Sequence, residues 1–182
     1  MQNVEFKAEL RDLAAARRQC ELLGARLVGT LNQSDTYYKL PDGRLKRRET
    51  RSTPGDPGGL GSIEWIFYHR ADRISPRLSV YSILTDVQAR RRWGTYSLRQ
   101  WLIVVKNREL WMFNNVRIHL DKVQELGTYL EFEAVVSPQF DVRRCHAEVS
   151  RLRELFAPVL GEPISASYSD LLAQAQADRT TT

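Results

Sequence analysis

The chain has 182 residues, of which 42% are hydrophobic and 27% are charged, and its formal net charge is +5. This length is enough for one domain with a sizeable core, and the composition is that of an ordinary globular protein. It excludes a membrane-spanning helix, because no apolar run approaches the roughly 20 residues required, and the N-terminal residues lack the pattern of a signal peptide.

The first part of the chain predicts strands around one helix. Residues 4–10 alternate between apolar and charged side chains, which is the periodicity of a strand. Asp12 is a suitable N-cap for a helix that ends near Gly24. Further strands are predicted at residues 25–39 and 44–51, on either side of a turn at Pro41-Asp42-Gly43. Residues 52–62 predict a flexible connection that is too short to separate two domains.

The second part of the chain also predicts strands together with helices. Strands are predicted at 63–70, 77–84, 116–121 and 128–136, and residues 98–112 predict either two strands or one bent strand. A short helix is predicted at 85–93, a longer one after Pro138, and a smaller one at 168–177. We expect residues 1–177 to form a single domain and residues 178–182 to be a disordered tail.

Most connections between these strands are too short for parallel crossovers, so the sheet should be mainly antiparallel. The predicted fold class is α+β: a closed antiparallel eight-stranded β-barrel with helices packed outside. Cys20 and Cys145 both fall in predicted helices without metal-ligating neighbours, which favours a reducing, cytoplasmic location.

The basic residues point to an anionic partner. Lysine occurs only at positions 7, 39, 46, 106 and 122, and arginine supplies the rest. Arginine presents a planar fork of donors that suits phosphate and carboxylate oxygens. Nucleic acid, nucleotide and polyphosphate all remain open at this point. The Arg90-Arg91-Arg92 cluster lies on a predicted outer helix, and we interpret it as a solvated face.

Charged residues recur at every second position within several predicted strands. For any single pair, the ordinary explanation is the solvated face of a half-buried strand. Lys106 and Arg108, however, follow residues 102–105, which are apolar on both faces, so we expect this strand to begin covered on both sides. If helices cover the apolar outside of a barrel, the charges line its interior. The recurring positions are Glu5 and Lys7, Lys46 and Arg48, Lys106 and Arg108, Arg117, His119 and Asp121, and Glu131 and Glu133.

A dry interior with unpartnered like charges would be strongly unfavourable. It becomes reasonable if it holds water, a polyanion and a divalent cation, because carboxylates hold Mg²⁺ and the metal bridges phosphate oxygens.

Several motifs in chain order resemble those of one known family. They are Val4-Glu5-Phe6-Lys7, Asp35-Thr36-Tyr37-Tyr38, Gly43 to Glu49, Tyr68-His69-Arg70, Val105 to Arg108, Arg117 to Val123, Glu131-Phe132-Glu133 and Tyr168 to Leu172. Their order and spacing resemble the CYTH superfamily, the triphosphate tunnel metalloenzymes that include class IV adenylate cyclases, thiamine triphosphatases and inorganic triphosphatases. The resemblance covers about residues 3–172.

The resemblance implies a set of site residues. Those that would bind a triphosphate are Lys7, Lys46, Arg48, Arg70, Lys106, Arg108 and Arg117. Those that would hold Mg²⁺ or Mn²⁺ are Glu5, Asp121, Glu131 and Glu133, and those nearest the chemistry would be Glu5, Lys7, Arg117 and Asp121. Tyr37, Tyr38, Tyr68 and His119 are second-rank candidates, and we favour a packing role for each. Asn3 stands where the family has its first glutamate, which puts a two-metal site in doubt.

The function implied is metal-dependent hydrolysis of a nucleoside or inorganic triphosphate. Cyclisation of ATP to cyclic AMP, a non-catalytic nucleotide- or polyphosphate-binding module, and processing of an RNA 5′-triphosphate are the alternatives. The expected partner is a small triphosphate-containing molecule. We expect no membrane partner and no other nucleic acid, and a homodimer stays open.

Overall fold

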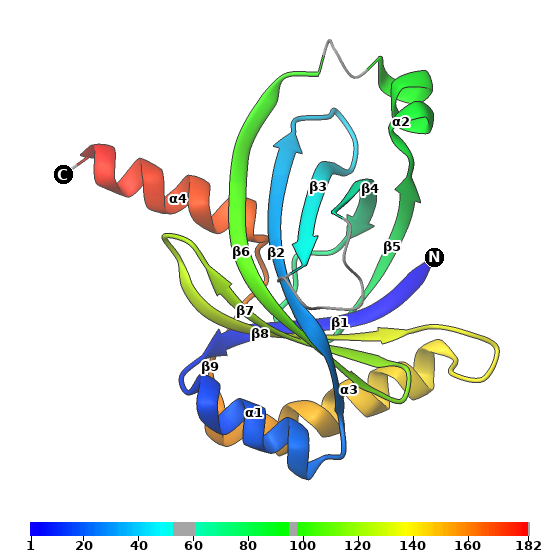
Figure 1. Cartoon of the computed structure of the whole chain (residues 1–182), viewed down its shortest axis with the longest axis vertical. Coiled ribbons are helices and arrows are strands. Elements are labelled where there is room, and N and C mark those ends of the chain that lie inside the picture. The colour runs from blue at the N-terminus through cyan, green and yellow to red at the C-terminus, as the bar shows by residue number, and fades with distance from the viewer. Residues whose placement is uncertain (53–60, 95–97, 182) are drawn as a thin grey trace.

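The computed structural model describes residues 1–52, 61–94 and 98–181 and has a barrel at its centre (Figure 1). Its eight strands are β1 (Gln2–Leu10), β2 (Arg26–Tyr38), β3 (Arg44–Ser52), β4 (Ser62–Arg70), β5 (Arg77–Leu84), β6 (Gln100–Phe113), β7 (Val116–Val123) and β8 (Gly127–Val135). The predicted strand at 98–112 is therefore one continuous strand. Most of the predicted connection at 52–62 lies outside the described residues.

Antiparallel pairing joins the strands in the order β5-β4-β3-β2-β6-β7-β8-β1, and β1 also pairs with β5, which closes the barrel. The predicted eight-stranded α+β barrel is thus confirmed. A ninth strand, β9 (Leu160–Pro163), was not predicted; it pairs with β1 outside the barrel, where Leu10 lies opposite Leu160. Four residues are too short to display a strand period.

The largest apolar cluster lies on the outer face of β1, β7 and β8. Two helices cover it: α1 (Leu13–Leu22) and α3 (Val142–Phe156) (Figure 1). The buried side chains Val4, Phe132 and Leu152 belong to this layer. Because side chains alternate along a strand, the same three strands direct their charged residues into the barrel.

The helices begin where the sequence predicts. Asp12 caps α1 by accepting a hydrogen bond from the Ala15 amide, and Asp141 caps α3 in the same way. Thr85 and Gln88 form a capping box at α2 (Asp86–Trp93). A smaller cluster with Leu45, Trp65 and Ala89 packs α2 against the outer face of the barrel. Cys20 and Cys145 are buried free thiols on α1 and α3.

The C-terminal helix α4 (Tyr168–Thr181) is longer than predicted. The helix continues through residues 178–181, for which the sequence predicted a disordered tail. Gln174 donates a hydrogen bond to Asp178, and Arg179 forms an ion pair with Glu125 on the β7–β8 turn. Contacts to a distant turn are invisible in a local sequence pattern. Thr182 lies outside the described residues.

One expectation about β6 is wrong. Leu102 and Val104 are buried, but Ile103 and Val105 on the opposite face are each 44% exposed. The first half of β6 is therefore covered on one side only. None of the helices in the described part of the chain has the length and apolar character to cross a membrane.

Candidate functional site

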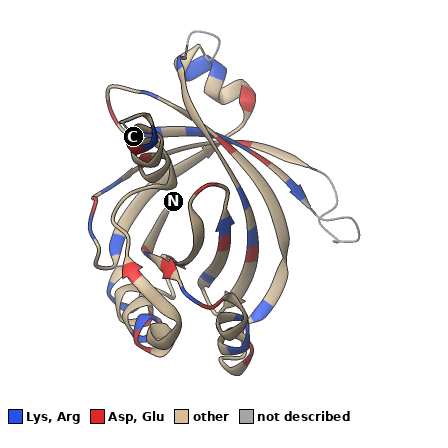
Figure 2. Cartoon of the chain, turned by 90° about the vertical axis from the view of Figure 1, so that its left-hand side faces the viewer, with Lys and Arg blue, Asp and Glu red and all other residues tan. Residues whose placement is uncertain are grey.

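A cavity of about 300 Å³ occupies the barrel interior. Both signs of charge recur along the strands that surround it (Figure 2). All seven cations predicted to bind a triphosphate line this cavity, as do Glu5, Glu131 and Glu133. Their common position follows from strand parity, because they sit at alternate residues of six strands.

Three candidate metal ligands lie together on β7 and β8. Ligand atoms of His119, Glu131 and Glu133 lie within 4.8 Å of one another. Burial, assisted by the charge of Arg108, lowers the pKa of His119 despite the nearby carboxylates, which favours the neutral imidazole that metals bind. Two carboxylates and an imidazole form a donor set suited to a divalent cation.

Glu5 extends this acidic group from β1. It lies opposite Glu133 in the β1–β8 register, and Lys7 lies opposite Glu131. Burial raises the pKa of Glu5, and the Glu131 and Glu133 carboxylates add to the rise although Arg70 opposes it. A bound cation would stabilise the ionised form of Glu5, and the neighbouring carboxylates and imidazole complete a set of residues that fits a divalent metal ion.

Asp121, also predicted as a metal ligand, accepts hydrogen bonds from protein side chains instead of joining the His119-Glu131-Glu133 group. It is fully buried rather than at the cavity surface, and it receives two hydrogen bonds of 2.6 Å from Arg108. The Tyr168 hydroxyl donates a third, at 2.8 Å. Both carboxylate oxygens therefore hold protein groups in this structure. A role in metal binding stays a prediction that requires these contacts to rearrange.

Asp35 begins one of the family-like motifs but was not among the predicted site residues, and it organises three of the cations. It is fully buried on β2 and receives hydrogen bonds of 2.7 Å from two nitrogens of Arg48. Lys46 Nζ lies 3.0 Å and Lys106 Nζ 3.6 Å from its Oδ2 atom. Burial would raise the pKa of Asp35, but these three cations outweigh it and hold the pKa well below its ordinary value.

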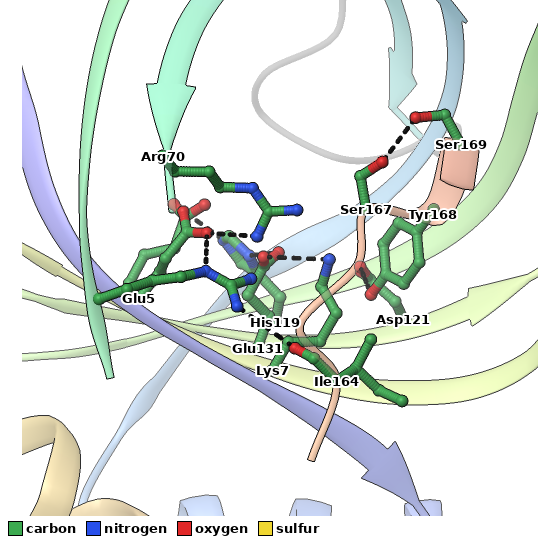
Figure 3. Close-up of polar contacts among 12 residues, drawn as sticks. Glu5, Lys7, Arg70, His119, Asp121, Glu131, Ile164, Ser167, Tyr168 and Ser169 are labelled. Atoms are coloured by element: carbon green, nitrogen blue, oxygen red, sulfur yellow. Dashed lines mark hydrogen bonds and ion pairs between the residues drawn. The ribbon is translucent and has the colours of Figure 1, made fainter. Parts of the chain in front are cut away.

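From the sequence, an empty barrel was expected to contain like charges without partners. In the structure, the interior charges are instead paired with one another. Each of the seven predicted cations lies within 4.0 Å of a carboxylate in the described part of the chain. Arg77 matches a family-like motif but was not among the predicted site residues, and it joins them by donating a 3.0 Å hydrogen bond to Glu5. Glu5 also accepts a hydrogen bond of 2.7 Å from Arg70 (Figure 3). A ligand must compete with these internal pairs.

The positive charges of Lys46 and Lys106 are poorly compensated, because both lysines share the single carboxylate of Asp35 with Arg48. Burial, together with Arg48, lowers the pKa of Lys46 to about 8, even though Asp35 opposes the shift. Burial and Arg108 similarly lower the pKa of Lys106 well below its ordinary value. These two ammonium groups would gain most from an added anion.

We expect tripolyphosphate affinity to fall as the pH rises through about 8, because Lys46 then loses the charge that attracts the anion. Below that pH the ammonium form is present and binding is strongest. Titration calorimetry from pH 7 to 9, roughly one unit either side of that pKa, measures the effect. Lys46→Arg is the matched control, since its guanidinium stays charged. Parallel pH profiles for both proteins would contradict the assignment.

The remaining candidates divide between the cavity and the outer wall. Tyr37, Tyr68 and His119 line the cavity, whereas Tyr38 stacks on Trp65 outside it, with ring centroids 5.2 Å apart. Asn3 also lines the cavity, and its buried Oδ1 atom has no hydrogen-bond partner among the described residues. An amide oxygen can coordinate a metal but contributes no charge.

The comparisons with known proteins agree with this architecture. The model of the CYTH domain family matches residues 1–156, and a search of curated proteins found no match. Among solved structures, the PH1012 protein from Pyrococcus horikoshii is 19% identical, with a TM-score of 0.70 over 93% of this chain and 98% of that one. A protein from Vibrio parahaemolyticus described as a candidate adenylate cyclase is 17% identical, with a TM-score of 0.68 over 94% and 97% of the two chains. At these identities the likeness establishes the fold alone.

Proposed function

The chain belongs to the CYTH domain family, and from that premise we propose that its barrel binds a triphosphate together with a divalent cation and hydrolyses it. The observation that carries the proposal is the cavity itself. Seven Lys and Arg side chains and a His-Glu-Glu group face one cavity of about 300 Å³. Such an arrangement suits a compact polyanion with a counter-cation.

The cations divide the work of binding. Lys46, Arg48 and Lys106 approach the cavity from β3 and β6, and Lys7 and Arg117 approach it from β1 and β7. Their donors would orient the phosphate oxygens and neutralise charge that develops on them, which is most of what phosphoryl transfer requires of a protein.

Glu131 and Glu133, with His119 beside them and Glu5 opposite, would hold the divalent cation. When bound, such an ion neutralises phosphate oxygens and orients a water molecule for attack. Glu133 also lies 3.0 Å from Arg117 Nε, so this carboxylate places a phosphate-binding cation next to the metal ligands.

Hydrolysis of the terminal phosphate demands less of this cavity than cyclisation does. A cyclase must deprotonate a ribose hydroxyl, hold it in line with the α-phosphorus and fix the base. Asn3 contributes no charge where a further carboxylate would help to activate a nucleophile. A neutral residue at this position weighs most against the more demanding reaction.

The test is a product assay with a panel of triphosphates, including ATP and tripolyphosphate, in Mg²⁺ and in Mn²⁺. Orthophosphate as the main product supports the proposal. Cyclic AMP and pyrophosphate, formed from ATP faster than orthophosphate from any triphosphate, would replace it with adenylate cyclisation. Tight binding without turnover would indicate a binding module.

A separate prediction concerns stability. We expect tripolyphosphate and Mg²⁺ together to raise the free energy of unfolding by about 2.7 kcal/mol at 100 times the dissociation constant. The reason is that the ligands bind only the native state, because the cavity does not exist in the unfolded chain, and binding therefore shifts the equilibrium toward the native state. Thermal melts with each ligand alone and with both provide the measurement. Unchanged melting temperatures with every triphosphate tried would argue against binding in the barrel.

A further inference from the structure

The C-terminal segment contributes to the cavity although it lies outside the residues that the family model matches. That match ends at residue 156, whereas Ser167 and Tyr168 line the cavity. Asp170 fixes this segment by accepting hydrogen bonds from the Ser167 amide at 3.0 Å and the Ser167 hydroxyl at 2.7 Å. It also lies 3.3 Å from Arg44, on β3. The first turn of α4 is therefore held against the barrel.

Tyr168 reaches cations on two strands through the face of its ring. Lys7 Nζ lies 4.0 Å from the ring centroid, and Lys106 Nζ lies 5.2 Å from it. The side chain is 3% exposed, so water screens these contacts little. A desolvated ammonium over an aromatic ring is stabilised by the negative face of the ring.

The hydroxyl of Tyr168 reaches a third cation indirectly. It donates to Asp121, which lies beside it in Figure 3. Asp121 in turn holds Arg108 through two hydrogen bonds. One side chain thus constrains three of the seven cations assigned to the triphosphate. A carboxylate at this position would neutralise the two lysines, whereas an aromatic ring orders them and leaves their charge available to a ligand.

We propose that Tyr168 is a positioning residue for the triphosphate, which orders Lys7 and Lys106 with its ring and Arg108 through Asp121. This rests on the proposed binding of a triphosphate in the barrel. It gives a role to the last of the family-like motifs, which lies beyond the residues that the family model matches.

The experiment measures tripolyphosphate affinity by calorimetry for wild type, Tyr168→Phe, Tyr168→Leu and Leu172→Ala. We expect Tyr168→Leu to weaken binding about tenfold, because both lysines lose the ring. Tyr168→Phe keeps the ring and loses only the hydrogen bond to Asp121, so it should retain most of the affinity, with a smaller loss that reports the contact through Asp121 to Arg108. Leu172→Ala is the control, since Leu172 also belongs to α4 and lies in the same apolar cluster as Tyr168. It should lower the melting temperature and leave the affinity within about twofold of wild type.

A purely structural Tyr168 predicts another pattern. Affinity would then follow the melting temperature in all variants, and Leu172→Ala would weaken binding as much as Tyr168→Leu. That result overturns the inference, as would equal affinity of Tyr168→Leu and wild type. If Tyr168→Leu does not fold, a Tyr168→Phe protein with tenfold weaker binding would overturn the role of the ring, and near-wild-type binding would support it. Absence of tripolyphosphate binding by wild type would instead overturn the proposed function, and this inference with it.

Discussion

Replacing Asp35 with asparagine is expected to lower the free energy of unfolding by about 3–5 kcal/mol, the usual effect of removing one partner from a buried ion pair. Asp35 is fully buried and holds Lys46, Arg48 and Lys106 together. The amide has the same shape but no charge, so three cations would remain in the interior without their shared anion. Urea unfolding at neutral pH measures the loss.

Asp72→Asn is the matched control. Asp72 also receives two hydrogen bonds from one arginine, Arg44, but its side chain is 52% exposed. An exposed pair of this kind contributes about 0–1 kcal/mol. Adding Lys106→Met to Asp35→Asn should recover part of the loss, because it removes one of the stranded charges. If the free energy of unfolding of Asp35→Asn lies within about 1 kcal/mol of the wild-type value, the Asp35 carboxylate does not organise these cations.

The barrel and its inward-facing charges could be predicted because strand parity is local. Glu5 and Lys7 share a face of β1, as Glu131 and Glu133 share one of β8, whatever the rest of the chain does. Once the apolar outer face is covered by α1 and α3, the charged positions can lie only inside. The family motifs then supplied the reason for an interior of this kind.

The pairing of those charges could not be predicted from the pattern within one strand, because it depends on the register between neighbouring strands. Asp35 lies opposite Arg48 on β3, and Arg108 lies opposite Asp121 on β7. Position 35 had a detectable signal, since it shares the parity of Gln33 and Tyr37, which also face inward. Tyr168 had none beyond a motif, because its contacts depend on where α4 meets the barrel.

The exposed start of β6 illustrates the same limit. Ile103 and Val105 have the composition of a covered strand, yet no described helix packs on them, since α4 reaches only the face that carries Leu102 and Val104. Apolar character predicts that a face can be buried, but the number and placement of the helices decide whether it is.

The second large effect is expected at the acidic group. Glu131→Gln and Glu133→Gln should each reduce triphosphate turnover about 100-fold at limiting metal, the scale of losing one preorganised electrostatic contact. An amide retains a ligand oxygen but removes the charge that attracts a divalent cation, so excess metal should recover part of the activity. Turnover measured against Mg²⁺ concentration, at saturating triphosphate, gives the metal half-saturation for each variant.

A metal role and a merely structural role predict different results for these two glutamates. Glu131 also accepts a 3.1 Å hydrogen bond from Arg108 and lies 3.6 Å from Lys7, so its loss will disturb triphosphate binding as well. Glu133 pairs with a single triphosphate-binding cation, Arg117, and is the cleaner probe. Arg117→Ala provides the crossed comparison: it should chiefly raise the KM for the triphosphate, whereas Glu133→Gln should chiefly raise the metal half-saturation. Because the two side chains lie 3.0 Å apart, each variant should also shift the other value by a smaller amount. Full activity and unchanged metal dependence in both glutamine variants would remove these carboxylates from the metal site and leave Glu5 to be tested in their place.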